Sequence, residues 1–160
     1  MRITRLVPAR LIGGKYASAI GRRVFPPVDT ALQRATRGRA SLTRAIGMRL
    51  LMLETIGRRS GEPRVTPLIF ATQDSDFVVV GSNWGQAHNP AWALNLVANP
   101  DAVATLDGER IPVRARRLTE QERAEVWPLM LEVYPAYDEY ARRVQASSGR
   151  EIMVFRLERA

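Results

Sequence analysis

Residues 57–64 read GRRSGEPR, an octapeptide that combines three arginines with two glycines and a proline. Glycines let backbone N–H groups approach a ligand closely, and guanidinium groups form charge-assisted, often bidentate hydrogen bonds to phosphate or carboxylate. The same composition is typical of a solvated hairpin tip. Taken alone, the octapeptide therefore predicts either an ordinary exposed turn, which is the commoner outcome, or a cradle for an anion.

A second candidate is GSNWGQAHNPAW, residues 81–92, which joins an apolar run to the expected start of a helix. The N-terminus of a helix carries free N–H donors suited to an anion or to the polar edge of a ring. Ser82 and Asn83 could hydrogen-bond such a ring, and Trp84 or Trp92 could stack on it, although Trp92 could equally be an ordinary core residue. His88 is expected to be structural or solvated, because no nucleophile elbow accompanies it.

The third candidate is YPAYDEY, in which Tyr134, Tyr137 and Tyr140 follow one another at intervals of three residues. On one helix this spacing spreads the rings over one side. The rings could wall a flat apolar pocket and present their hydroxyl groups as hydrogen-bond donors. The alternative is a set of amphipathic tyrosines that half-cover a barrel.

The composition limits the chemistry available. The chain has 160 residues, no cysteine and one histidine. Disulfides and thiolate chemistry are therefore excluded, and a metal site is not expected because a zinc enzyme draws its ligands mostly from these residue types. No G-x-G-x-x-G or Walker A motif occurs. No apolar stretch approaches the ~20 residues of a membrane span.

The positive charge is concentrated near the N-terminus. Residues 1–50 hold 11 Lys and Arg against one acidic residue, whereas the remainder holds 13 against 15. We expect residues 1–45 to form a basic helical segment that either packs with a solvated face or touches an anionic membrane surface. Nucleic-acid binding is not expected, because no aromatic residues alternate with the arginines. A signal peptide is not expected either, since Arg10 and the pair Gly13-Gly14 interrupt any apolar core, so a cytoplasmic location is predicted.

From residue 46 the pattern predicts a second domain, 46–160. RLLMLETI, RVTPLIFAT, FVVVGS, AVATL, ERIPVRARRL and REIMVFRLER read as six strands joined by turns, with Pro67 marking an edge or a bulge. Asn89 is the expected N-cap of a short helix with Pro90 in its first turn, and Thr119 with Glu122 forms a capping box for a longer one. Strands joined mainly by hairpins favour an antiparallel α+β protein with a closed or half-closed barrel.

The order of these segments resembles the deazaflavin-dependent nitroreductase family. TIGRRSGEPRVTPLIF, VVVGSNWGQAHNPAWALNLVANP, a hairpin ending in VRARRLT, and ERAEVWPLMLEVYPAYDEY follow one another as in that family, over residues 50–158. The resemblance implies a split β-barrel related to FMN-binding pyridoxamine-phosphate oxidases. It also implies coenzyme F420, a 5-deazaflavin with an anionic phospholactate and oligoglutamate tail, and an actinobacterial source.

The resemblance carries over to individual positions. It implies that the anionic tail of the coenzyme is bound by Arg58, Arg59, Ser60 and Arg64, and that the coenzyme continues along Val65, Thr66, Pro67, Leu68 and Ile69. The deazaflavin ring would lie against a strand end, Val80, Gly81, Ser82 and Asn83, and a helix start, Ala91, Trp92, Ala93, Leu94 and Asn95. The substrate would lie beside Tyr134, Tyr137 and Tyr140, with Tyr137 also beside the coenzyme.

The implied activity is hydride transfer from reduced F420 to a quinone, a nitroaromatic compound or a similar flat acceptor. Tyr137 or Ser82 is the expected proton donor. Ala91 stands where the family can have a larger side chain, and Asn83-Trp84 replaces a smaller or basic pair. The alternatives are an FMN-dependent reductase of the same fold and a non-catalytic F420 carrier. We also expect a homodimer. Residues 1–45 could make peripheral contact with the inner face of the cell membrane.

Overall fold

The computed structural model describes residues 49–160, in which Leu50–Ala160 form one compact unit. The expected basic segment 1–45 lies outside the described residues. The elements follow in the order β1 (Leu50–Ile56), β2 (Pro63–Gln73), β3 (Asp76–Val80), the short 3₁₀ turn η1 (Asn83–Gly85), α4 (Ala91–Ala98), β4 (Asp101–Leu106), β5 (Glu109–Arg117), α5 (Glu120–Val133), α6 (Tyr137–Ser147) and β6 (Val154–Arg159).

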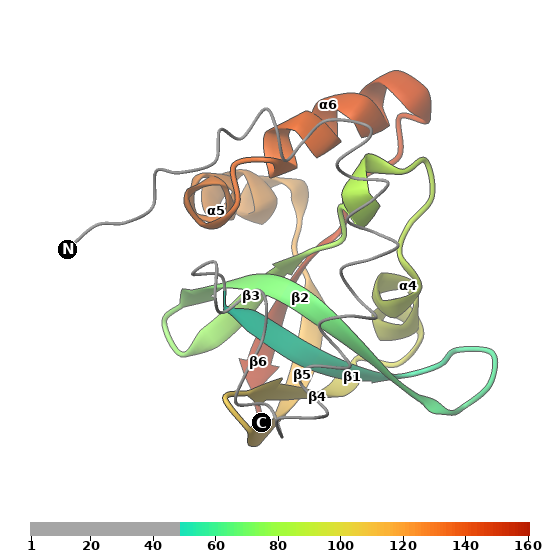
Figure 1. Cartoon of the computed structure of the whole chain (residues 1–160), viewed down its shortest axis with the longest axis vertical. Helices are drawn as coiled ribbons and strands as arrows, with labels where there is room; N and C mark the ends of the chain where they lie inside the picture. Colours follow the sequence, from blue (N-terminus) through green and yellow to red (C-terminus); the bar gives the residue numbers. More distant parts are fainter. Residues whose placement is uncertain (1–48) are drawn as a thin grey trace. The chain divides into compact units, whose positions relative to one another are not determined.

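The six strands form a closed antiparallel barrel in the order β1-β2-β3-β6-β5-β4, with β4 paired back to β1 (Figure 1). All six predicted strands are confirmed, and so is the barrel class. The hairpin between β4 and β5 turns at Asp107 and Gly108, which both have positive φ as a type I′ turn requires. The last strand in the sequence, β6, lies between β3 and β5 and pairs with both.

The barrel is filled by side chains from its strands and from α4. Leu51, Leu53, Val79 and Leu157 are fully buried, and the rings of Phe70 and Phe77 meet edge to face at 5.5 Å. Burial of this apolar surface is the main stabilising contribution to the unit. The barrel interior is therefore a packed core, and a ligand must bind on its outside or at its ends.

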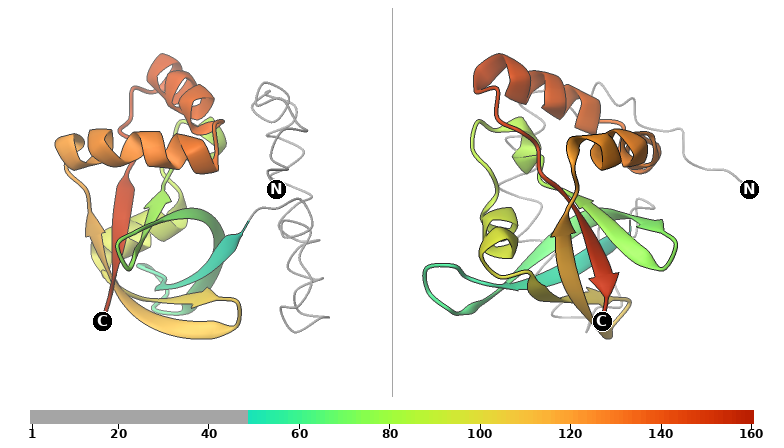
Figure 2. Two further views of the ribbon diagram at one scale, coloured as in Figure 1. Left: turned by 90° about the vertical axis from the view of Figure 1, so that its left-hand side faces the viewer. Right: turned by 180° about the vertical axis from the view of Figure 1, so that it is seen from behind.

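The helices cover distinct parts of the barrel. Helices α5 and α6 lie across one end, and α4 lies beside the strands near the turn that joins β1 to β2 (Figures 1 and 2). The loop that contains η1 reaches from β3 towards α6 before the chain enters α4. The second candidate segment therefore connects α6, which carries two of the tyrosines, to α4, which lies near the arginine turn.

Strand β2 pairs with a different neighbour in each of two parts of its length. Residues 63–69 pair with β1, whereas β3 pairs with β2 only from Phe70 to Gln73. Pro67 lies in the part with one strand neighbour among the described residues, opposite Met52, so the ring of proline removes no hydrogen bond from a second neighbour. The edge position expected for Pro67 is thus observed, and no bulge is needed.

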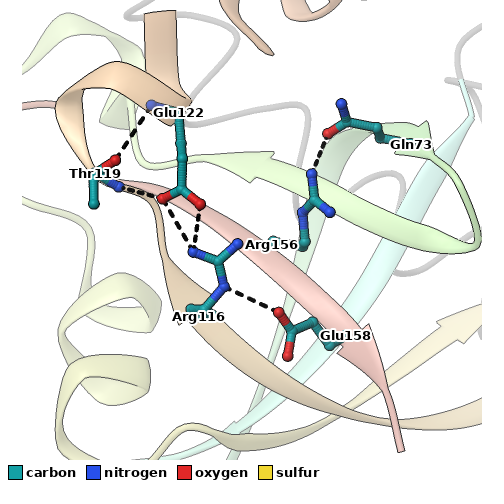
Figure 3. A network of polar contacts seen from close by, with 6 residues as sticks. All are labelled: Gln73, Arg116, Thr119, Glu122, Arg156 and Glu158. Atoms are coloured by element: carbon teal, nitrogen blue, oxygen red, sulfur yellow. Dashed lines mark hydrogen bonds and ion pairs between the residues drawn. The ribbon is translucent and has the colours of Figure 1, made fainter. Parts of the chain in front are cut away.

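Helix α5 begins with the predicted capping box. The Thr119 hydroxyl accepts a hydrogen bond from the Glu122 N–H, and the Glu122 carboxylate accepts one from the Thr119 N–H (Figure 3). Glu122 also pairs with Arg116 of β5, whose guanidinium bonds Glu158 of β6. The backbone N–H of Thr119 and the Arg116 guanidinium hold the pKa of Glu122 below its usual range. The cap therefore fixes α5 to two strands.

The predicted start of α4 was wrong by one residue. The N-cap is Pro90, not Asn89, and the helix starts at Ala91. The Asn89 side chain does not cap the helix because its amide oxygen accepts a hydrogen bond from Arg150. The predicted end is confirmed, since α4 stops before Asn99.

Candidate functional site

The arginine turn between β1 and β2 is closed by its own backbone. The Gly57 N–H bonds the Glu62 carbonyl at 2.8 Å, and the Gly61 N–H bonds the Gly57 carbonyl at 2.7 Å. A Cβ on Gly57 would lie 2.6 Å from the Ser60 Oγ and 3.2 Å from the Glu62 carbonyl oxygen, so a larger residue would require the Ser60 side chain to move. Arg58, Arg59 and the Ser60 side chain are all exposed on this turn. The structure therefore presents cations on a short, locally ordered loop.

The charges of this turn have no acidic partner where the structure describes the chain. Arg58, Arg59 and Arg64 make no ion pair with any residue in the described part of the chain. Most other arginines on the strands and helices do, in the pairs Arg110–Glu54, Arg114–Asp101, Arg116–Glu122, Arg116–Glu158, Arg117–Glu151, Arg142–Glu139 and Arg143–Glu139. An uncompensated cluster of guanidinium groups attracts an anion.

Asn95 of α4 joins the arginine turn to the barrel. Its side-chain oxygen accepts hydrogen bonds from the Arg58 backbone N–H at 3.1 Å and from the Arg58 guanidinium at 3.4 Å. Its amide nitrogen donates to the Thr55 hydroxyl at 3.2 Å. Asn95 and Thr55 are both buried. One amide therefore fixes the turn relative to the helix and the strand.

The end of β3 is packed tightly against the start of α4. The Gly81 N–H bonds the Met153 carbonyl at 2.8 Å. A Cβ on Gly81 would lie 3.1 Å from the Met153 carbonyl oxygen and 3.6 Å from side-chain carbons of Pro90 and Ala93. The backbone beyond Val80 consequently lies directly beside the first turn of α4.

This junction offers two groups of backbone donors. The side chain of Pro90 provides no cap for α4, so the first N–H groups of the helix, those of Ala91 to Ala93, have no acceptor within residues 49–160. Ser82 is in the right-handed helical region and Asn83 in the left-handed one, an arrangement that turns successive N–H groups into one concave nest. No acceptor for the N–H groups of Ser82 and Asn83 is found among residues 49–160.

The loop after Ser82 holds an unusual backbone. Asn83 and Trp84 have φ of 47° and 57°, and Gly85 follows with 73°. A bulky residue such as Trp84 rarely adopts this region, and such strain persists only where surrounding contacts enforce it. The Asn83 side chain donates to the His88 carbonyl, and the Trp84 carbonyl accepts from Arg143 of α6. His88 is exposed and contributes its backbone to this loop.

The three tyrosines lie together, but not along one helix. Tyr134 caps the end of α5 and Tyr137 opens α6, because Pro135 separates the two helices. The expected spacing on one helix face was therefore wrong. The Tyr134 and Tyr140 hydroxyls bond each other at 3.2 Å, whereas the Tyr137 hydroxyl bonds no other residue within the described part. The rings of Trp84 and Trp127 extend the cluster to the loop and to α5.

Burial sets the acidity of this cluster. Desolvation raises the pKa of Tyr134, Tyr137 and Tyr140 above the usual tyrosine range. Each phenol therefore stays protonated at neutral pH and can donate a hydrogen bond or a proton, but cannot act as a base. Tyr137 is the only one of the three whose hydroxyl is uncommitted within the described residues.

Trp92 does not present its ring to the outside. It is buried in the core and meets Phe155 edge to face at 5.9 Å. Of the α4 residues predicted for the ring, Ala91 is exposed and Leu94 half-buried. A contribution of Trp92 to ligand binding would therefore come from its backbone N–H.

Two contributors were not recognised in the sequence. Arg150, between α6 and β6, bonds four acceptors in the loop after β3. Thr55 supports Asn95 from β1. Neither lies in a motif, and their partners are 40 to 69 residues away along the chain. Only the folded barrel brings them together.

Two further observations concern residues 49–160. No group of three or more His, Asp or Glu side chains in that range is arranged to hold a metal ion. No helix in the same range is long and apolar enough to cross a membrane.

The closed antiparallel barrel with its flanking helices defines a class, that of the split-barrel proteins. Within this class the comparison with protein families is specific. The chain belongs to the F420H(2)-dependent quinone reductase family, whose model matches residues 27–158. The resemblance noted from the sequence is thereby confirmed.

Individual relatives agree with this assignment. A Mycobacterium tuberculosis protein named "Putative F420H(2)-dependent quinone reductase Rv3178" is 41% identical over 88 residues, which cover 55% of this chain and 74% of the relative. The solved structure of the F420-H2 dependent reductase FDR-A has a TM-score of 0.61 and 32% identity over 68% of this chain and 93% of its own. Another solved structure, described as a domain-swapped dimer, has a TM-score of 0.64 and 29% identity, and the match covers 82% of this chain and 99% of its own.

Proposed function

We propose that the protein is an F420H2-dependent oxidoreductase that reduces a quinone, a nitroaromatic compound or a similar flat acceptor. The single observation that carries this proposal is the family match over residues 27–158, which contains the whole candidate site. The relatives named as F420H(2)-dependent quinone reductases support the same coenzyme and the same class of acceptor.

The residues present suit such a coenzyme. Arg58, Arg59 and Arg64, which have no acidic partner among residues 49–160, would bind its anionic tail together with Ser60, and residues 65–69 of β2 would continue along it. The strand end Val80–Asn83 and the α4 start, Ala91–Asn95, would hold the ring, and their backbone N–H groups that have no acceptor in the described part of the chain would bond its polar edge.

The bound deazaflavin would supply a hydride from the carbon that replaces the flavin N5. The protein's part is to bind, orient and exclude water. Tyr134, Tyr137 and Tyr140 would border the acceptor. The Tyr137 phenol, which stays protonated at neutral pH and has no hydrogen-bond partner in the described part of the chain, is the proposed proton donor, with the Ser82 hydroxyl as the second candidate. A hydride and a proton together convert a quinone to its hydroquinone.

A titration of the full chain with F420, followed by the absorbance and fluorescence of the coenzyme, tests the first half of this proposal. Reduced F420 with menadione, followed by reoxidation of the coenzyme, tests the second. We expect saturable binding at micromolar coenzyme and protein-dependent reoxidation. No binding in that range would overturn the proposal. Binding without turnover of quinones or nitroaromatics would favour the non-catalytic F420 carrier. Preferential binding of FMN over F420 would favour the FMN-dependent reductase.

We further propose that residues 1–45 form a separate basic segment that contacts anionic lipid from the cytoplasmic side. Its support is charge alone, because basic residues near an anionic surface contribute about 1 kcal/mol each. Sedimentation of the full chain with phosphatidylserine vesicles, and not with phosphatidylcholine vesicles, is the expected result. Equal recovery with both would remove this proposal.

A homodimer is proposed on the strength of the domain-swapped dimer among the similar structures. Sedimentation equilibrium of the purified chain is the test, and a single monomeric species over the accessible concentrations would contradict it.

A further inference from the structure

Arg150 lies under the loop that joins β3 to α4 and bonds both of its ends. Its guanidinium donates to the carbonyl oxygens of Gly81 at 3.3 Å and Ser82 at 2.8 Å, where the loop begins. It also donates to the Gln86 carbonyl oxygen at 3.0 Å and the Asn89 side-chain oxygen at 2.9 Å, where the loop ends. A single planar group thereby fixes the span of the loop.

These bonds also set the direction of the donors in the loop. In a trans peptide the C=O and the following N–H point in opposite directions. Because the carbonyls of Gly81 and Ser82 point at Arg150, the N–H groups of Ser82 and Asn83 point away from it. Those are the two N–H groups for which the described residues provide no acceptor.

The positive charge of Arg150 acts on the Gly81–Ser82 and Ser82–Asn83 peptide groups, whose carbonyl oxygens it bonds. All its partners are neutral oxygens, and within residues 49–160 it makes no ion pair. Burial lowers its pKa, but a guanidinium remains charged at neutral pH. A cation bonded to a carbonyl polarises the peptide and strengthens the N–H on its other side.

The strained backbone beside these donors needs such support. Asn83 and Trp84 both have positive φ, a region that is unfavourable for residues other than glycine. Arg150 bonds the Ser82 carbonyl just before this pair and the Gln86 carbonyl two residues after it, and Arg143 bonds the Trp84 carbonyl between them. Loss of Arg150 would free the loop to relax.

We propose that Arg150 is a positioning residue for the coenzyme ring, because it aims and polarises the N–H donors of Ser82 and Asn83 from behind the loop. This role rests on the proposed function. Arg150 itself does not touch the coenzyme, and its contribution reaches the ring only through the backbone it holds.

The test compares Arg150→Ala with Arg123→Ala in the full chain. Arg123 is also half-buried and donates to a backbone carbonyl, that of Ile152, but contacts no part of the loop. The readouts are the F420 dissociation constant from fluorescence titration, the spectrum of the bound coenzyme and the melting temperature. We expect Arg150→Ala to weaken binding about tenfold or more and to shift the bound spectrum, while Arg123→Ala leaves both unchanged.

Rescue separates positioning from a general loss of structure. Millimolar guanidinium chloride, matched against sodium chloride, should recover affinity in Arg150→Ala and have no effect on Arg123→Ala. Arg150→Lys keeps the charge but cannot reach both ends of the loop, so an intermediate affinity is expected; it also serves if Arg150→Ala does not fold.

Wild-type affinity in Arg150→Ala and Arg150→Lys would overturn the role of Arg150, as would equal losses of affinity and melting temperature in Arg150→Ala and Arg123→Ala. Absence of F420 binding by the wild-type chain would instead overturn the proposed function, and the positioning role with it. The two failures are therefore distinguishable.

Discussion

At the scale of single residues, the arginines of the β1–β2 turn and the buried Asn95 have different roles. The arginines are exposed and have no acidic partner among residues 49–160, whereas Asn95 holds the turn in place through Arg58 and Thr55. Changes on the two sides of this contact should therefore affect different measurements.

The first prediction concerns the charge. Arg58→Ala with Arg64→Ala should raise the F420 dissociation constant at least tenfold, because charge-assisted hydrogen bonds to the tail are lost, and should alter single-turnover hydride transfer much less. Fluorescence titration and stopped-flow reoxidation measure the two. Arg110→Ala with Arg114→Ala removes the same charge from ion-paired strand positions and is the control. An unchanged dissociation constant in the first double variant would refute the tail site.

The second prediction concerns the amide. Asn95→Ala leaves the Thr55 hydroxyl and the Arg58 N–H without their buried partner, and should lower the free energy of unfolding by about 1–3 kcal/mol. Urea unfolding of the variant measures this. Asn99→Ala, which removes a more exposed bond to the Asp101 N–H, should cost less. Equal costs would mean that the Asn95 bridge contributes little.

Between elements, the contact of the β3–α4 loop with α6 links the coenzyme side of the proposed site to the acceptor side. Trp84 and Tyr140 have ring centroids 6.3 Å apart, and Gly85 lies against the Tyr140 backbone. A displacement of α6 would therefore move the loop that carries the backbone donors.

Gly85→Ala tests this contact. The new Cβ would lie 3.2 Å from Arg143 Cδ and 3.3 Å from Tyr140 Cα, at a φ of 73°. Gly108→Ala has a similar φ penalty but open space around it, so it isolates the backbone cost. We expect Gly85→Ala to lose about 1–3 kcal/mol of stability beyond Gly108→Ala and to weaken F420 binding, both measured as above. Equal behaviour of the two variants would show that the loop does not depend on α6.

For the whole molecule, the buried tyrosines should set an alkaline limit to stability. Their pKa is raised in the folded state, so above the ordinary tyrosine pKa of about 10 the unfolded chain loses protons that the folded chain retains. Stability is complete below that pH and falls as pH rises above it. The melting temperature should decline above about pH 10, and less steeply in Tyr134→Phe.

Tyrosinate absorbance provides the check. The chain has four tyrosines, and the three of the cluster should ionise only as the protein unfolds. Full reversible titration of all four near the ordinary pKa, without loss of structure, would contradict the burial described for the cluster.

Structural features set by residues close together in the sequence could be predicted, whereas features set by residues far apart in the sequence could not. The Asp107-Gly108 turn and the Thr119–Glu122 capping box were predicted correctly because each is determined within four residues. Asn89 was misassigned because its amide is taken by Arg150, 61 residues away. The left-handed Trp84 could not be predicted either, since its neighbours on α6 enforce a conformation that its own side chain disfavours.

The place of β6 has a consequence for the order in which the protein is made. Strands β3, β2, β1, β4 and β5 can pair as an open sheet, but β3 and β5 meet no common partner until Val154–Arg159 is present. Arg150 and Met153, which bond the loop after β3, lie just before β6 in the chain. A chain that has not yet been translated through β6 therefore exposes two unpaired strand edges, on β3 and β5, and has an unfinished loop. The site proposed for the coenzyme ring can form only after β6 has been made.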